Sequence, residues 1–106
     1  MANFMQMMQK AQLVKKKMED IQARAAEMTV SGEAGDLVTC TINGKFEVQS
    51  IKIAKDAVNP SETDVLEDLI VAALRDARQK AEKMIGTETE KMMKDLGLPP
   101  GMSLPF

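Results

Sequence analysis

Histidine, tryptophan and tyrosine are absent from this 106-residue chain, which contains a single cysteine. Without histidine, the chain lacks the side chain that most often acts as a general base or metal ligand near neutral pH. Cys40 has no histidine to activate it, so we interpret it as a small core residue rather than a nucleophile. The glycines at positions 32, 35 and 44 match no phosphate-binding spacing and are interpreted as turn residues. We therefore expect a protein that is not an enzyme and uses no metal, cofactor or small-molecule substrate.

Aromatic residues make up only 3% of the chain, and no apolar run approaches the length of a membrane-spanning helix. Because aromatic rings provide the platforms on which unpaired bases stack, their scarcity argues against recognition of RNA or single strands. One cysteine cannot form an internal disulfide, and the opening MANFMQMMQKAQ does not resemble a signal peptide. These features favour a cytoplasmic protein with no membrane partner.

Apolar residues make up 44% of the chain and charged residues 28%, which at this length predicts one globular domain. Ten methionines replace part of the missing aromatic volume, and such a thin, adaptable core favours oligomerisation. The net charge of −2 is unevenly distributed, because residues 1–30 carry five cations and three acids, whereas residues 62–106 carry six cations and nine acids. The basic excess therefore lies in the first segment.

Residues 29–53 are predicted to form a three-stranded antiparallel sheet, because short runs rich in Val, Ile and Thr alternate with turn residues. The Asn43-Gly pair indicates a hairpin between the second and third strands. A two-residue loop would place the apolar residues of one strand on the polar face of the other. A three-residue loop avoids this by pairing Ile42 with Phe46, and the apolar alternation then predicts a bulge near residues 49–50.

Residues 1–28 are predicted to form one long helix with an apolar seam. The seam residues recur in steps of three and four, the roughly 3.5-residue repeat of a coiled coil. They are Phe4, Met7, Ala11, Val14, Met18, Ile21, Ala25 and Met28. The seam could pack on the chain's own sheet or on another molecule. Its length favours a mixture, with one end docked and the other extended.

Three cations flank this seam on one side of the helix. Lys10, Lys17 and Arg24 are seven residues apart and therefore occupy equivalent positions. Such a column has two interpretations. It could be the solubilising flank of a coiled coil, or it could contact nucleic acid, because regularly spaced Lys and Arg neutralise phosphates without reading bases.

Residues 61–96 are predicted to form a second long helix that follows an Asn-Pro-Ser sequence, with Ser61 as its N-cap. Its first half has a wide apolar face rich in alanine, which allows close approach to a sheet. Its second half is more polar, and Gly86 is expected to weaken or bend it. Leu96 and the following glycine predict a C-cap, and the tail of residues 97–106 is too proline-rich for a helix or central strand.

The predicted fold class is α+β, with the order α-β-β-β-α in one domain of residues 1–106. Long N- and C-terminal helices flank a three-stranded antiparallel sheet. Apolar positions on the hairpin and the second helix are predicted to form the core or a dimer contact. They are Val38, Ile42, Phe46, Val48, Leu66, Leu69, Ile70 and Ala73.

Four segments together resemble the YbaB/EbfC family of small bacterial nucleoid-associated proteins. They are MQKAQ, VSGEAGDLVTCTINGKFEVQSIKI, VLEDLIVAALRDARQKAE and LPPGMSLPF. No single segment is diagnostic, but their order and spacing are specific and cover nearly the whole chain. The resemblance implies an intertwined homodimer, in which the sheets and second helices form a body and the N-terminal helices project as two arms.

The resemblance also implies binding to double-stranded DNA with low sequence specificity, a place in the nucleoid, and effects on nucleoid organisation and gene expression. It implies DNA contacts on the arms, and the matching candidates are Lys10, Lys15, Lys16, Lys17 and Arg24. Two chains at −2 give a dimer at −4, so affinity should depend on local placement of cations. The alternative is a protein-interaction adaptor linked to recombination or replication proteins, which would use the Met-rich seam and the tail.

Overall fold

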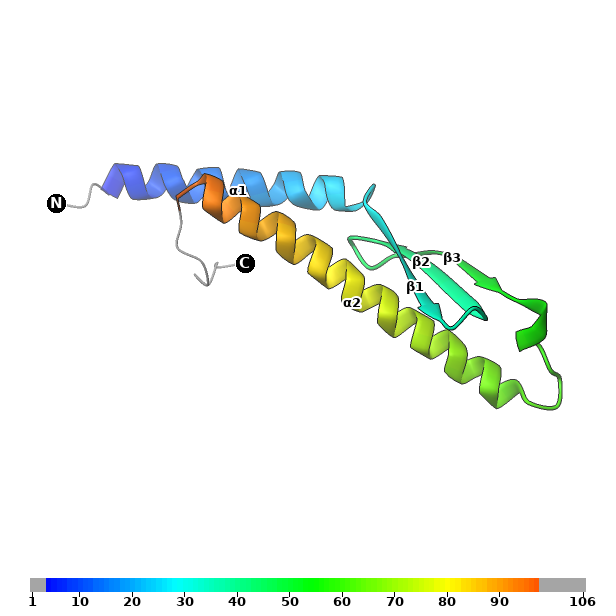
Figure 1. The fold of residues 1–106 in the computed structure, drawn as a ribbon. Coiled ribbons are helices and arrows are strands. Elements are labelled where there is room, and N and C mark those ends of the chain that lie inside the picture. The colour runs from blue at the N-terminus through cyan, green and yellow to red at the C-terminus, as the bar shows by residue number, and fades with distance from the viewer. Residues whose placement is uncertain (1–3, 98–106) are drawn as a thin grey trace.

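The computed structural model describes residues 4–97, and these residues form the predicted order of elements (Figure 1). The elements are helix α1 (Phe4–Ala25), strands β1 (Thr29–Ala34), β2 (Val38–Asn43) and β3 (Val48–Ile53), the 3-10 helix η1 (Lys55–Ala57) and helix α2 (Thr63–Asp95). The α+β class and the α-β-β-β-α order are therefore confirmed. The predictions for residues 1–3 and for most of the tail lie outside the described residues.

The three strands form an antiparallel sheet in chain order, β1-β2-β3. The predicted bulge is confirmed near the start of β3. Thr41 pairs with Ser50, whereas the next residue, Ile42, pairs with Val48, so Gln49 is an extra residue on β3. A bulge of this kind increases the local twist of the strand and resets which side chains face the helix.

The predicted three-residue loop between β2 and β3 is wrong. Ile42 pairs with Val48 rather than with Phe46, and four residues separate the two strands. The positive φ in this loop falls on Phe46, at 64°, and not on Asn43 or Gly44. The Asn-Gly pair therefore does not form the tight turn that its sequence predicts.

Asn43 instead ties the loop to the end of α1. Its buried side chain accepts two backbone N–H groups of the loop at Oδ1 and donates from Nδ2 to the carbonyl of Ala26 at 3.2 Å. The N–H of Gly44 donates to the carbonyls of Ala25 and Met28, at 2.8 and 2.9 Å. Because these bonds satisfy carbonyls that a helix end leaves unpaired, α1 ends at Ala25 rather than at the predicted residue 28.

Helix α2 lies very close to β1 because the contact is lined by small residues. Ala73, Ala77 and Ala81 of α2 are 0% exposed. A Cβ atom built on Gly32 of β1 would overlap the backbone nitrogen of Ala77 and the carbonyl oxygen of Ala73. The interpretation of Gly32 as a turn residue is therefore wrong, since it marks the close approach of a strand backbone to a helix backbone.

Side chains of α2 also cover the outer edge of β1. The N–H of Glu33 donates to Oδ2 of Asp76 at 2.9 Å, and Nζ of Lys80 donates to the carbonyl of Ser31 at 3.1 Å. The hydrogen bond from the Glu33 backbone, aided by Lys80, holds the pKa of Asp76 below its usual value. The edge of β1 is thereby closed to a further strand, which leaves β3 as the open edge of the described sheet.

The ends of α2 match the prediction in part. Its N-cap is Glu62 without a side-chain cap, so the predicted cap by Ser61 is wrong. The N–H of Ser61 instead donates to Oδ1 of Asn59 at 3.0 Å, in the turn that precedes the helix. The helix continues through Gly86, and Gly97, with φ of 70°, follows the C-cap as predicted.

The path of α2 decides which apolar residues are buried. Most of the positions predicted for the core or a dimer contact lie buried or half-buried at the contact between α2 and the sheet: Val38, Ile42, Leu66, Leu69, Ile70 and Ala73. Phe46 and Val48 are 47% and 53% exposed, because α2 crosses β1 and β2 and leaves β3 uncovered. These two residues do not belong to the core of the single chain, and their assignment to a dimer contact stays a prediction.

Helix α1 is docked near its C-terminal end and extends at its N-terminal end, as its seam predicts. Val14 and Ile21 are buried in a second cluster with Met92 and Met93 of α2, whereas Phe4 is 73% exposed. The helix therefore packs on the polar second half of α2 and not on the sheet. The projecting arm therefore comprises α1 and the second half of α2, from about residue 85 (Figure 1). It is not α1 alone, as the resemblance implies.

Candidate functional site

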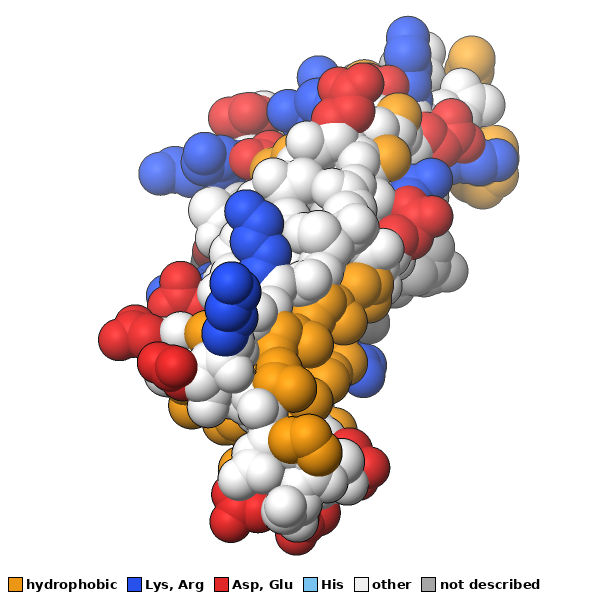
Figure 2. All heavy atoms as spheres, turned by 90° about the vertical axis from the view of Figure 1, so that its right-hand side faces the viewer, with side chains coloured by type: hydrophobic (Ala, Val, Ile, Leu, Met, Phe, Trp, Pro, Cys, Tyr) orange, Lys and Arg blue, Asp and Glu red, His pale blue; other side chains and the backbone are white. Residues whose placement is uncertain are grey.

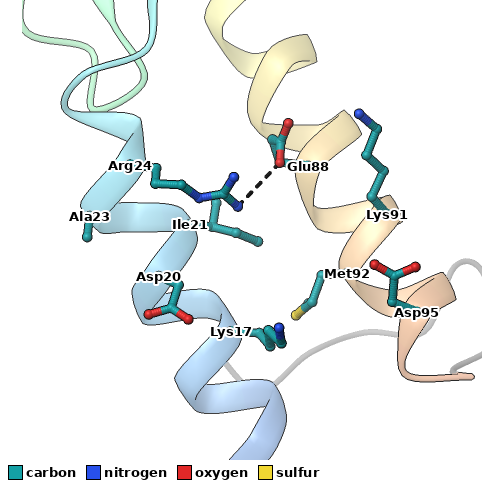
Figure 3. A pocket seen from close by; sticks show the side chains of 9 residues that line it. All are labelled: Lys17, Asp20, Ile21, Ala23, Arg24, Glu88, Lys91, Met92 and Asp95. Atoms are coloured by element: carbon teal, nitrogen blue, oxygen red, sulfur yellow. Dashed lines mark hydrogen bonds and ion pairs between the residues drawn. The ribbon is translucent and has the colours of Figure 1, made fainter.

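A groove of about 620 Å³ lies between α1 and the C-terminal half of α2, in the projecting arm (Figure 3). Because the two helices run in opposite directions, residues 17–24 of α1 face residues 88–95 of α2. The groove is lined by Lys17, Asp20, Ile21, Ala23, Arg24, Glu88, Lys91, Met92 and Asp95. Ile21 and Met92 are buried between the helices, and the charged residues surround them.

The rim of the groove combines charges of both signs. Three cations come from both helices, namely Lys17, Arg24 and Lys91. Three acids lie among them, namely Asp20, Glu88 and Asp95. The formal charge of the groove is therefore zero, and any attraction for a polyanion must come from the placement of individual cations rather than from a uniform positive field.

One ion pair crosses the groove. Nη2 of Arg24 lies 3.4 Å from Oε2 of Glu88 (Figure 3), with side-chain exposures of 60% and 21%. The other ion pairs of residues 4–97 are Arg78–Glu82 and Lys80–Asp76, both within α2. The Arg24–Glu88 pair therefore stands alone among the described pairs in linking the two helices of the arm.

The structure does not bring the five predicted DNA-binding residues onto one face. Lys17 and Arg24 line the groove, and Lys10 precedes them by one heptad on the same side of α1. Lys15 and Lys16 are exposed but diverge from Lys17, because adjacent positions on a helix differ by about 100°. A single flat contact would therefore use only part of the predicted set.

Lys91 was not predicted as part of this site. It lies in the second helix, a segment with more acids than cations. A count of net charge therefore gives no reason to single out one of its cations. Only the packing of α1 against the second half of α2 brings Lys91 into the groove that contains Lys17 and Arg24. A seven-residue spacing within one helix gives no signal for a partner on another helix.

The described residues provide little else for chemistry. Cys40 is fully buried in the core cluster, and burial raises the pKa of its thiol, which disfavours the reactive thiolate. Within residues 4–97, no group of three His, Cys, Asp or Glu side chains is placed to hold a metal ion. Neither of the described long helices contains a stretch apolar enough to cross a membrane.

Residues 1–96 match the sequence model of the YbaB/EbfC DNA-binding family. The chain belongs to this family. The match includes both helices of the arm and the whole sheet, so it covers every element that forms the groove. The resemblance inferred from the four sequence segments is thereby confirmed.

Several curated proteins are similar to this chain over its full length. A nucleoid-associated protein of Rhodospirillum rubrum is 44% identical over 107 residues, with complete coverage of both chains. Nucleoid-associated proteins of Rhodospirillum centenum and Agrobacterium fabrum are 46% and 41% identical, again with complete coverage of both chains. The similarity therefore spans all 106 residues of this chain and the full length of these three relatives.

Proposed function

We propose that this YbaB/EbfC family member is a nucleoid-associated protein that binds double-stranded DNA as a homodimer, with low sequence specificity. The observation that carries this proposal is the arm groove, where Lys17 and Arg24 of α1 meet Lys91 of α2. The relatives named as nucleoid-associated proteins support a place in the cytoplasmic nucleoid. An effect on nucleoid organisation and gene expression follows from binding of this kind.

The chemistry of the arm suits phosphates better than bases. Lys and Arg side chains donate to phosphate oxygens and carry no sequence information by themselves. Lys10, Lys15 and Lys16 extend the cationic surface along the exposed part of α1. Phe4 is the only aromatic residue on the described arm, so stacking on unpaired bases has little support, and duplex DNA is the favoured partner.

A salt titration tests the proposal directly. We expect the binding constant for duplex DNA to fall steeply with salt, with a log–log slope of about −0.9 for each phosphate contacted. We also expect nearly the same affinity for random and genomic sequences, because phosphate contacts do not distinguish bases. Fluorescence anisotropy on labelled duplexes measures both. A strong preference for one sequence at constant salt would contradict binding through phosphates.

The homodimer is supported by an uncovered apolar surface at the sheet end of the molecule. Val48, Ile51 and Ile53 of β3 are 53%, 41% and 41% exposed, although they pair with buried residues of β2 and so share the face that α2 covers elsewhere. Figure 2 views this end and shows hydrophobic side chains gathered in a continuous patch. A second copy of the chain, with its own apolar patch, is the occupant that we propose.

Replacing Ile51 with aspartate is expected to separate the two copies without unfolding either. Dimer formation would have to bury the unpaired carboxylate of the new aspartate. This cost should weaken the dimer by more than about a hundredfold. Analytical ultracentrifugation measures the mass, and circular dichroism checks the fold.

The matched control for this variant is Ser50→Asp. It places the same charge on the other face of β3, where Ser50 pairs with Thr41. That variant is expected to remain a dimer. A wild-type chain that sediments as a monomer at tens of micromolar would contradict the dimer itself, since a contact relevant to function must form at such concentrations.

A protein-interaction adaptor is the second candidate function. It is favoured by the N-terminal half of α1, where Phe4, Met7 and Met8 are 73%, 62% and 47% exposed. Methionine-rich surfaces adapt to differently shaped partners. Affinity capture with and without nuclease distinguishes the two functions, because an adaptor retains its partners after DNA is digested.

A further inference from the structure

The ion pair across the arm groove is weak in its geometry. The contact joins Nη2 of Arg24 and Oε2 of Glu88 at 3.4 Å, whereas strong guanidinium–carboxylate pairs are bidentate and lie at about 2.7–2.9 Å. The Arg24 side chain is 60% exposed, so water competes for it. A guanidinium held this loosely is available to another anion.

The Glu88 side chain is more buried in the groove than the Arg24 side chain. The Glu88 side chain is only 21% exposed and projects from α2 into the groove. Its carboxylate is therefore held beside Arg24 in the free protein. A phosphate that approaches Arg24 has to displace this carboxylate or remain close to a charge of the same sign.

We propose that Glu88 is an internal competitor of the DNA phosphate for Arg24, and that this competition lowers both the affinity and the salt dependence of binding. The inference rests on the proposed function, because it assigns a regulatory residue to the same groove. When a phosphate binds Arg24, the Arg24–Glu88 pair breaks, so the new interaction replaces an internal one instead of adding to it.

This competition concerns one specific ion pair and not the overall charge of the groove. The groove has a formal charge of zero, and neutralising Glu88 alone changes it to +1. Among residues 4–97, Glu88 is the acid within ion-pair distance of Arg24, whereas the other groove acids, Asp20 and Asp95, are not. Removing the Glu88 carboxylate should therefore release a specific cation and not merely shift the net charge.

The test compares Glu88→Gln with Glu90→Gln. Glu90 is an exposed acid in the same turn of α2 but does not line the groove, so both variants change the net charge equally. Salt titrations on one duplex are measured for both variants and for the wild type. Each variant is also made in an Arg24→Gln background, and circular dichroism confirms that all of them are folded.

We expect Glu88→Gln to bind DNA about two- to fivefold more tightly than the wild type, the range that releasing a partly exposed ion pair allows. The log–log salt slope should steepen by up to about 0.9 for each arm that contacts the DNA, the value of one further phosphate contact. Glu90→Gln should change affinity by well under about twofold, because an exposed charge outside the groove is screened by salt. In the Arg24→Gln background, the advantage of Glu88→Gln over Glu90→Gln should disappear.

Two results would overturn the inference in distinguishable ways. If the wild type binds DNA but Glu88→Gln and Glu90→Gln behave alike, or if the advantage of Glu88→Gln persists without Arg24, then competition for Arg24 is wrong and the proposed function stands. If the wild type binds no duplex at any salt concentration, the proposed function fails and the competition fails with it.

Discussion

Changing Lys10, Lys17 and Arg24 together to glutamate is expected to abolish the retardation of duplex DNA in a gel. These three cations share one side of α1, and Lys17 and Arg24 also line the groove. Removing three proposed phosphate contacts from each chain, six from the dimer, should reduce the log–log salt slope by up to about 5.4, at about 0.9 for each. The acids that replace them should also repel the backbone. An electrophoretic titration with protein up to tens of micromolar measures the loss.

The matched control for charge reversal changes Lys52, Lys55 and Arg75 to glutamate. These exposed cations lie in β3, η1 and the first half of α2, away from the arm, and the variant has the same net charge. It should retain most of its DNA binding, because exposed charges more than about 10 Å apart are largely screened at moderate salt. Equal losses in both triple variants would show that net charge, and not the arm, governs binding.

Replacing Gly32 with alanine is expected to produce the largest loss of stability among the glycine-to-alanine changes of residues 4–97. The new Cβ would overlap backbone atoms of Ala73 and Ala77, and a helix backbone cannot move aside as a flexible side chain does. Overpacking of a core costs about 1–3 kcal/mol and occasionally more. We expect at least about 3 kcal/mol here, or a fall in Tm of more than about 12 °C, measured by thermal denaturation.

Gly86→Ala is the control for this substitution, because it adds the same methyl group in α2 without a clash. A Cβ atom at Gly86 would meet nothing within 4 Å. In the interior of α2, alanine should therefore raise stability by about 0.5–1 kcal/mol. If Gly32→Ala melted at the wild-type temperature, the close approach of β1 and α2 would be contradicted.

The β2–β3 connection shows what local sequence could not predict. Alternation of apolar residues located the bulge correctly, because the face of a strand is a local property. The loop prediction is wrong because Asn43 bonds at once within the loop and outside the hairpin, to the carbonyl of Ala26 at the end of α1. A turn signal covers only bonds within the turn. It cannot include a contact that joins residues 17 apart in sequence.

The arm shows the same limit at a longer range. The repeat from Phe4 to Met28 was sufficient to predict a long helix with one docked and one extended end. It did not identify the docking partner, because the second half of α2 is polar and its buried residues Met92 and Met93 stand out only when α1 lies beside them. The membership of Lys91 and Glu88 in the groove was hidden for the same reason.

The sequence by itself determined the order of helices and strands, the alanine face of α2, the family and the column of cations on α1. All but the family depend on residue spacing within one element. The regular geometry of a helix or strand places residues of a given spacing on the same face of that element. Only the tertiary structure decided that Gly32 touches a helix, that β3 stays uncovered, and that Arg24 meets Glu88. Those contacts join segments far apart in the chain, and their geometry follows from how the helices cross and pack, which no spacing within a single element specifies.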